Sequence, residues 1–136
     1  MSKDLLFRLQ SKVKDRKILD DSVIEYIDNI FSNKSDKVLE VLKRGIIKKI
    51  YNPSKRVVWI AIGEKKKKRK KNEHLVYPKL YCSCQDFYKN VVVKRERDFC
   101  KHILAQIICE ELNTYKIIEL KDTEYQKLIT ELELKF

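Results

Sequence analysis

The sequence predicts an α+β fold, with helices at both ends of the chain and a small antiparallel sheet between them. Apolar residues recur at helical spacing in residues 1–44 and again after residue 100. Between these regions, β-branched and aromatic residues flank the turn-forming cluster Asn52-Pro53-Ser54-Lys55. Only two Gly and two Pro occur among 136 residues, which favours long regular elements over linkers. We therefore expect a single domain that spans residues 1–136.

Three helices are expected in the N-terminal part, residues 1–44. The first covers about residues 3–17, where apolar residues follow helical spacing. Asp20 or Asp21 should cap the second helix, because a carboxylate accepts bonds from the free N–H groups at a helix start. Asp36 is expected to cap a third, short helix, and Gly45 suits its end.

The β part is expected over residues 45–81. A hairpin from Ile46 to Gly63 would be followed by a third strand at about residues 74–81. Pro78 lacks a backbone donor, so this strand should be an edge strand or contain a break. The intervening residues 64–72 are expected to form an exposed loop, because seven adjacent like charges repel one another.

Two further helices are expected in the C-terminal part. Residues 82–112 contain clustered Cys and His residues and then a helix that should begin near Asp98 to Cys100. Residues 113–136 should contain a last helix at about 122–134, with its apolar residues on one face.

The apolar pattern indicates where in the cell the protein is located. No apolar run approaches the roughly 20 residues that span a bilayer, and the N-terminus reads as an amphipathic helix and not as a signal peptide. We therefore expect an intracellular protein without membrane association, cytoplasmic or, in a eukaryotic source, nuclear.

The net charge is +11. Residues 43–71 carry thirteen Lys and Arg against the single acid Glu64, so this one region holds +12.

Three cysteines and a histidine form a pattern that is typical of a zinc site. Cys82-x-Cys84 is followed, after fifteen intervening residues, by Cys100-x-His102. In a reducing compartment, clustered cysteines bind metal more often than they form disulfides. Three thiolates and one imidazole complete a tetrahedral shell and leave no position for water, so we expect one structural Zn²⁺.

The spacing sets requirements on the backbone at both pairs. Residues two apart on an extended segment share a face, so Cys82 and Cys84 can hold one ion. On a regular helix such residues diverge by about 200°, so Cys100 must lie at the irregular start of its helix, with Asp98 as a suitable cap. The alternative is that these are ordinary buried cysteines and an unrelated histidine. We expect Cys109 to be a small core residue and His74 an ordinary strand or loop histidine.

The basic region is a candidate nucleic-acid interface, since a concentrated positive field attracts polyanions. The alternatives are a solvated Lys-rich surface or, in a eukaryotic source, a nuclear import signal. Tyr51, Trp59 and Tyr77 can in principle stack on bases, although we expect them in the core or on strand faces. The candidate contact residues are Lys48, Lys49, Lys55, Arg56, Lys65, Lys66, Lys67, Lys68, Arg69, Lys70 and Lys71.

The metal-ligand residues and their flanks resemble the SWIM zinc finger. The segments Tyr81-Cys-Ser-Cys-Gln-Asp-Phe87 and Phe99-Cys-Lys-His-Ile-Leu-Ala105 carry this resemblance. More broadly, residues 23–132 resemble the family of small SWIM-domain subunits of the Shu complex, with the strongest similarity over residues 80–108. The basic run at residues 65–71 departs from the family, being longer and more basic than its pattern.

The resemblance implies a non-catalytic adaptor in homologous recombination and DNA repair. Its partners would be a RecA-like recombinase paralogue and single-stranded DNA. An enzyme is not expected, because the zinc shell is closed and the sequence has no Gly-rich phosphate loop. The alternative function is a stand-alone module that binds nucleic acid without sequence specificity.

Overall fold

A computed structural model describes residues 2–32, 34–63, 73–96 and 99–134. The described helices are α1 (Ser2–Arg16), α2 (Asp21–Ile30), α3 (Ser35–Arg44), α4 (Lys101–Leu112) and α5 (Asp122–Leu134). The strands are β1 (Ile46–Asn52), β2 (Arg56–Ile62), β3 (Glu73–Tyr77), β4 (Tyr81–Cys82) and β5 (Lys116–Lys121). A π-helix, η1 (Phe87–Val93), connects the sheet to α4. None of the helices in these ranges is long and apolar enough to cross a membrane.

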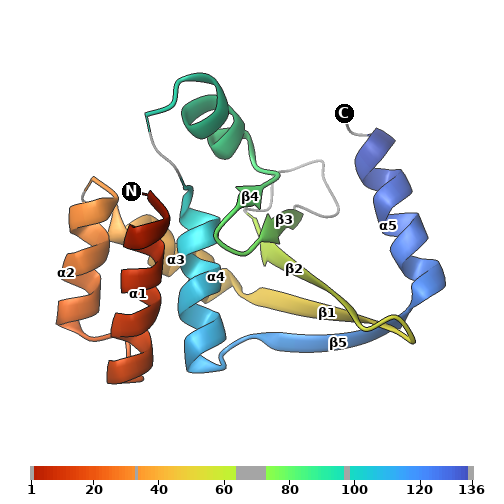
Figure 1. Cartoon of the computed structure of the whole chain (residues 1–136), viewed down its shortest axis with the longest axis horizontal. Helices are drawn as coiled ribbons and strands as arrows, with labels where there is room; N and C mark the ends of the chain where they lie inside the picture. The colour runs from red at the N-terminus through yellow and green to blue at the C-terminus, as the bar shows by residue number, and fades with distance from the viewer. Residues whose placement is uncertain (1, 33, 64–72, 97–98, 135–136) are drawn as a thin grey trace.

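The strands form one sheet in the order β4-β3-β2-β1-β5. We call the face that packs against α4 the front face and the face that packs against α5 the back face. Helices α1 and α3 pack on α4, so the helices gather at one end of the sheet, while α5 rises from the other end (Figure 1). The zinc-ligand segments lie where β4 and the start of α4 meet.

Each face of the sheet has its own hydrophobic cluster. On the front face, Trp59, Ala61 and Val76 join the large core that includes the buried face of α4. On the back face, a smaller cluster of Tyr51, Val58, Ile60 and Leu75 is covered by Tyr125 and Leu128 of α5. Strand side chains alternate between faces, so β1 and β2 supply apolar residues to both clusters.

The N-terminal helices occur where they were predicted, and one cap differs. Asp20 caps α2 by accepting a bond from the Val23 N–H at 3.1 Å. Gly45 ends α3 with a φ of 108°, a conformation that favours glycine. The cap assigned to Asp36 is wrong: Lys34 occupies the N-cap position without a side-chain bond, and Asp36 lies in the first turn. The Ser35 N–H is instead satisfied by Asp28 of α2, at 2.9 Å.

The α+β class is confirmed, and the sheet is larger than the predicted hairpin and third strand. The hairpin occurs as β1 and β2, which pair antiparallel. The break predicted at Pro78 is confirmed, because a turn at residues 78–80 divides the predicted third strand into β3 and β4. The additional strand β5 pairs parallel to β1, with Lys48 opposite Ile117. The sheet is therefore mixed and not purely antiparallel, because α4 carries the chain back to the start of β1.

Two features of the C-terminal part were predicted from the sequence, namely the range of the last helix and the start of α4. The last helix matches its predicted range of 122–134, as α5. Helix α4 begins directly after Cys100, which is its N-cap and has no side-chain capping bond. The cap predicted at Asp98 lies outside the described residues. The π-helix η1 was not predicted.

Candidate metal centre

The four predicted zinc ligands come together in the fold. The ligand atoms of Cys82, Cys84, Cys100 and His102 all lie within 4.8 Å of one another, and all four residues are buried. Two segments that are far apart in the sequence thus meet at the junction of β4 and α4. We call these four residues the zinc cluster.

The first pair of ligands is held on extended chain. Cys82 ends β4, and Cys84 follows it by two residues. Between them, Ser83 bonds to β3 twice: its N–H donates to the Leu75 carbonyl at 2.9 Å, and its Oγ accepts from the Leu75 N–H at 2.8 Å. These bonds fix the extended backbone, so that both thiols point into the same site.

The second pair converges because Cys100 is not helical. The backbone of Cys100 is extended, with φ of −114° and ψ of 174°, while His102 lies in the first turn of α4. This geometry confirms the requirement derived from the spacing. Beside Cys100, the ring of Phe99 packs against Phe31 with centroids 6.1 Å apart, which anchors the segment to the end of α2.

Two nitrogen–sulfur distances within the zinc cluster fit tetrahedral coordination. His102 Nδ1 lies 3.6 Å from the sulfur of Cys82 and 3.8 Å from that of Cys100. Zinc–sulfur bonds of about 2.3 Å and zinc–nitrogen bonds of about 2.0 Å place two ligand atoms of a tetrahedron roughly 3.5–3.8 Å apart. Nδ1 is therefore the nitrogen that would bind the ion. The cluster fits one structural zinc ion.

Electrostatics within the cluster also suit a cation. Hydrogen bonds from Cys100 and Cys82 lower the pKa of Cys84, whereas hydrogen bonds with Cys100 and Cys84 raise the pKa of Cys82. Burial raises the pKa of Cys100. Three buried thiolates repel one another, so a divalent cation is what allows all three to ionise together.

Neighbouring groups support the ligands from outside. The Phe87 N–H donates to the sulfur of Cys84 at 3.3 Å, which favours the thiolate form of that ligand. In addition, the ring of His74 from β3 packs against the ring of His102. The sequence analysis expected a strand or loop histidine at position 74; the structure places it on β3, and the contact was missed because it depends on the packing of α4 against β3.

Comparison with known proteins gives three relatives that share one designation. The chain is 32% identical over 96 residues to the zinc finger SWIM domain-containing protein 7 homolog of Dictyostelium discoideum, a match that covers 70% of this chain and 59% of the relative. It is 25% identical over 132 residues to zinc finger SWIM domain-containing protein 7 of Mus musculus, covering 94% of this chain and 82% of the relative. The protein of that name from Homo sapiens is 24% identical over 130 residues, covering 93% and 87%.

The chain is thus similar to SWIM-type zinc finger proteins. No family model matches it, and no solved structure does. The similarity to the three relatives agrees with the buried Cys₃His cluster.

The candidate nucleic-acid residues of the chain are spread over different surfaces. Lys48 lies on the front face, with Nζ 5.4 Å from the Trp59 ring and 5.6 Å from the Tyr115 ring. Lys49 lies on the back face and pairs with Glu73 at 3.8 Å. Adjacent residues of a strand point to opposite faces of the sheet, so Lys48 and Lys49 cannot contribute to the same surface.

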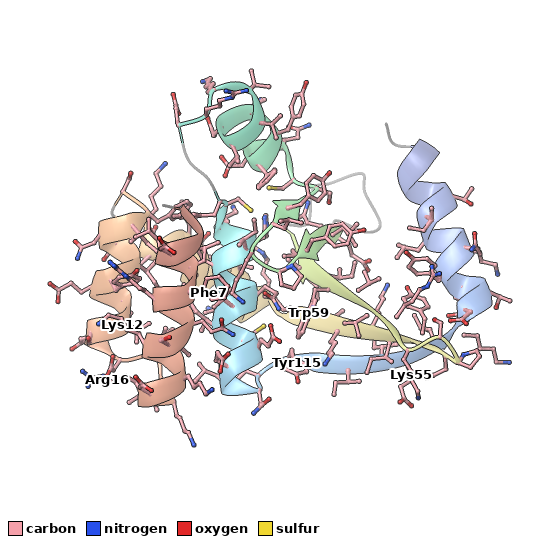
Figure 2. The ribbon with its side chains drawn as sticks, in the orientation of Figure 1. Phe7, Lys12, Arg16, Lys55, Trp59 and Tyr115 are labelled. Atoms are coloured by element: carbon pink, nitrogen blue, oxygen red, sulfur yellow. The ribbon has the colours of Figure 1, made fainter. Side chains whose placement is uncertain are left out.

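The two remaining cations of the hairpin lie near its turn. Lys55 donates to Asn52 Oδ1 at 2.8 Å, and it lies well away from Trp59 and Tyr115 (Figure 2). The Arg56 guanidinium stacks 4.8 Å from the ring centre of Tyr125. Residues Lys65, Lys66, Lys67, Lys68, Arg69, Lys70 and Lys71 lie outside the described residues, so nucleic-acid binding by the basic region stays a prediction.

The aromatic candidates for base stacking differ in how much of their surface is exposed. Tyr51 and Trp59 are buried, with 1% and 5% of their surface exposed, whereas Tyr77 is 43% exposed. The expectation that Tyr51 and Trp59 serve the core is therefore confirmed. Cys109 is buried as expected, 2% exposed.

Proposed function

We propose that this chain is a SWIM-type zinc finger protein that acts as a non-catalytic adaptor in homologous recombination and binds a RecA-like recombinase paralogue. The observation that carries the proposal is the closed, buried Cys₃His cluster in a chain that matches most of the length of its mouse and human relatives. A zinc ion with four protein ligands has no position for a reacting water. Its role is then to hold β4, η1 and α4 in one arrangement.

We propose in addition that the protein binds single-stranded DNA without sequence preference. The positive charge is concentrated in residues 43–71, and binding through Lys and Arg to phosphates is sequence-independent and strongly dependent on salt. The dispersal of Lys48, Lys49 and Arg56 over two faces leaves residues 65–71 as the main candidates for phosphate contacts.

Co-expression with each RecA-like paralogue of the source organism tests the adaptor. We expect one paralogue to form a stable complex that persists through size-exclusion chromatography in moderate salt. A failure of every paralogue to bind, together with salt-sensitive binding of the free chain to oligonucleotides, would replace the adaptor with a stand-alone nucleic-acid binding module.

A deletion of residues 65–71 tests the DNA contact separately. We expect the deletion to weaken binding to a thymidine oligonucleotide and to reduce the salt dependence of the affinity. A control variant, with Lys116 and Lys121 of β5 both changed to Ala, shows the effect of removing two positive charges elsewhere on the protein. An unchanged affinity after the deletion would remove residues 65–71 from the mechanism.

A further inference from the structure

Large exposed apolar side chains concentrate in one segment beside the zinc cluster. Of nine such side chains among the described residues, five fall between Tyr77 and Val93. They are Tyr77, Leu80, Tyr88, Val92 and Val93, and we call the surface that they form the η1 surface. Single exposed apolar residues are common, whereas a concentration of this kind marks an interaction site.

Aromatic contacts connect the two parts of this surface. The rings of Tyr77 and Tyr81 lie 5.9 Å apart, and those of Tyr81 and Phe87 lie 5.4 Å apart. The series runs from the end of β3 to the start of η1. The turn between β3 and β4 and the π-helix are therefore joined through the half-buried ring of Tyr81 and the buried ring of Phe87.

A cavity of about 350 Å³ opens on the η1 surface. Tyr81, Phe87, Tyr88 and Val92 contribute apolar walls, and the segment with Cys82 and Cys84 also lines it. Its volume is within the range of roughly 300–1,000 Å³ that is usual for binding pockets. Because two zinc ligands line the cavity, a bound zinc ion would hold this part of its wall in place.

The backbone that carries the cavity is unusual. η1 is a seven-residue π-helix, and π-helical turns are rare and occur frequently at functional sites. In the view of Figure 1 it lies above the end of the sheet, next to β4. Helix η1 buries Phe87 in the main core, while its residues Tyr88, Val92 and Val93 stay exposed.

Charge around the η1 surface indicates which partner fits. The described segment 77–96 contains the cations Lys79, Lys89, Lys94 and Arg95 against the acids Asp86 and Glu96. Asp86 accepts a hydrogen bond from Asn90 Nδ2 at 2.6 Å. The flanks of the apolar area are therefore net positive, and complementary carboxylates would be attracted to them.

An apolar cavity with cationic flanks favours a protein segment as the occupant over a nucleobase or a second copy of the chain. A nucleobase placed among apolar walls would leave its polar edges without hydrogen bonds. A second copy of the chain would bring two net charges of +11 together, which opposes association. A protein segment with an apolar face and flanking Asp or Glu residues satisfies both the cavity and the charge.

We propose that the η1 surface docks an amphipathic segment of a partner protein whose apolar anchor enters the cavity and whose carboxylates face Lys79, Lys89, Lys94 and Arg95. The inference rests on the proposed function for the class of partner, since the RecA-like paralogue would supply the segment. It also makes docking dependent on zinc, because Cys82 and Cys84 line the cavity.

Three synthetic helical peptides test the chemistry without a known partner. The first has a Leu and Phe face with Glu flanks, the second has the same face with Lys flanks, and the third keeps the Glu flanks and replaces the apolar face with Ser. Fluorescence anisotropy should show binding of the first peptide alone to the zinc-loaded protein. Equal binding of the first two peptides, or binding of none, would overturn the proposal.

Two variants place the binding on the η1 surface. Val92 is 50% exposed, so Val92→Asp should leave folding and zinc content intact while it weakens peptide binding about tenfold or more. Lys89→Glu should weaken binding of the Glu-flanked peptide and improve that of the Lys-flanked one. Ile18→Asp and Lys116→Glu are matched controls, at an apolar position that is 60% exposed and at an exposed cation elsewhere.

The same variants separate this inference from the proposed function. If a RecA-like paralogue binds the wild type and binds Val92→Asp equally well, docking at the η1 surface is wrong and the adaptor stands. If no paralogue binds the wild type, the proposed adaptor function is wrong. The peptide titrations then decide whether the η1 surface docks a protein segment. A loss of oligonucleotide binding or of self-association in Val92→Asp, with peptide binding unchanged, would assign the surface to DNA or to a second copy.

Discussion

The imidazole ring of His74 on β3 lies against the ring of the zinc ligand His102, with centroids 4.6 Å apart and planes at 40°. This contact joins the sheet directly to the metal centre, because β3 pairs with the central strand β2. The His102 ring is thereby packed against the sheet through His74, while the first turn of α4 carries its backbone.

Truncation of His74 should loosen the zinc site without removing a ligand. We expect His74→Ala to speed zinc release to a competing chelator by roughly tenfold, the lower end of the usual effect of groups that orient metal ligands. His74→Phe keeps a ring against His102 and should release zinc at nearly the wild-type rate. Similar release from wild type and His74→Ala would show that the contact does not hold the ligand.

Removal of a zinc ligand should have a much larger effect. We expect native mass spectrometry to show one zinc per chain in the wild type, and none or weakly held zinc in Cys84→Ser. Structural zinc contributes on the order of 10–16 kcal/mol in small zinc-finger peptides, so thermal unfolding monitored by circular dichroism should shift strongly downward. Cys109→Ser, outside the zinc cluster, should keep full zinc content. Equal zinc content in the two variants would contradict the assigned ligand set.

The start of α5 is fastened to the hairpin turn through Asp122. Its carboxylate accepts from the Ser54 hydroxyl at 2.7 Å and from the Ser54 N–H at 3.2 Å. We expect Asp122→Ala to lower the free energy of unfolding in urea by about 1–2 kcal/mol, since two hydrogen bonds are lost at an exposed site. Glu119→Ala, an exposed acid on neighbouring β5, is the control and should change stability little. Equal effects of the two variants would mean that the Ser54 bonds contribute nothing beyond surface charge.

Alkaline pH should destabilise the fold through Cys109. Burial, with the nearby charge of Glu110, raises the pKa of Cys109 from 9.0 to about 12. Above about pH 9 the unfolded chain loses this proton while the folded chain keeps it, so stability falls as pH rises toward 12. In urea unfolding between neutral pH and about pH 10, Cys109→Ala should lose less stability than the wild type. Parallel curves for the two proteins would contradict a raised pKa.

The sequence alone determined the elements whose signals are local. The apolar stripes of α2, α3 and α5 follow one helical period, the turn at Pro53 separates two β-rich runs, and Gly45 ends a helix by its own conformational freedom. The zinc cluster was also predictable from the chain, because thiolate and imidazole ligands with this spacing have few alternative uses.

Tertiary structure alone decided the features that depend on distant partners. Strand β5 is a short segment between two helices, and only its parallel pairing with β1 makes it a strand. The packing of His74 on His102 and the capping of Ser35 by Asp28 likewise join residues that carry no mutual signal in the sequence. Local periodicity reports which face of an element is apolar, whereas the surface that this face meets is chosen by the packing of the whole chain.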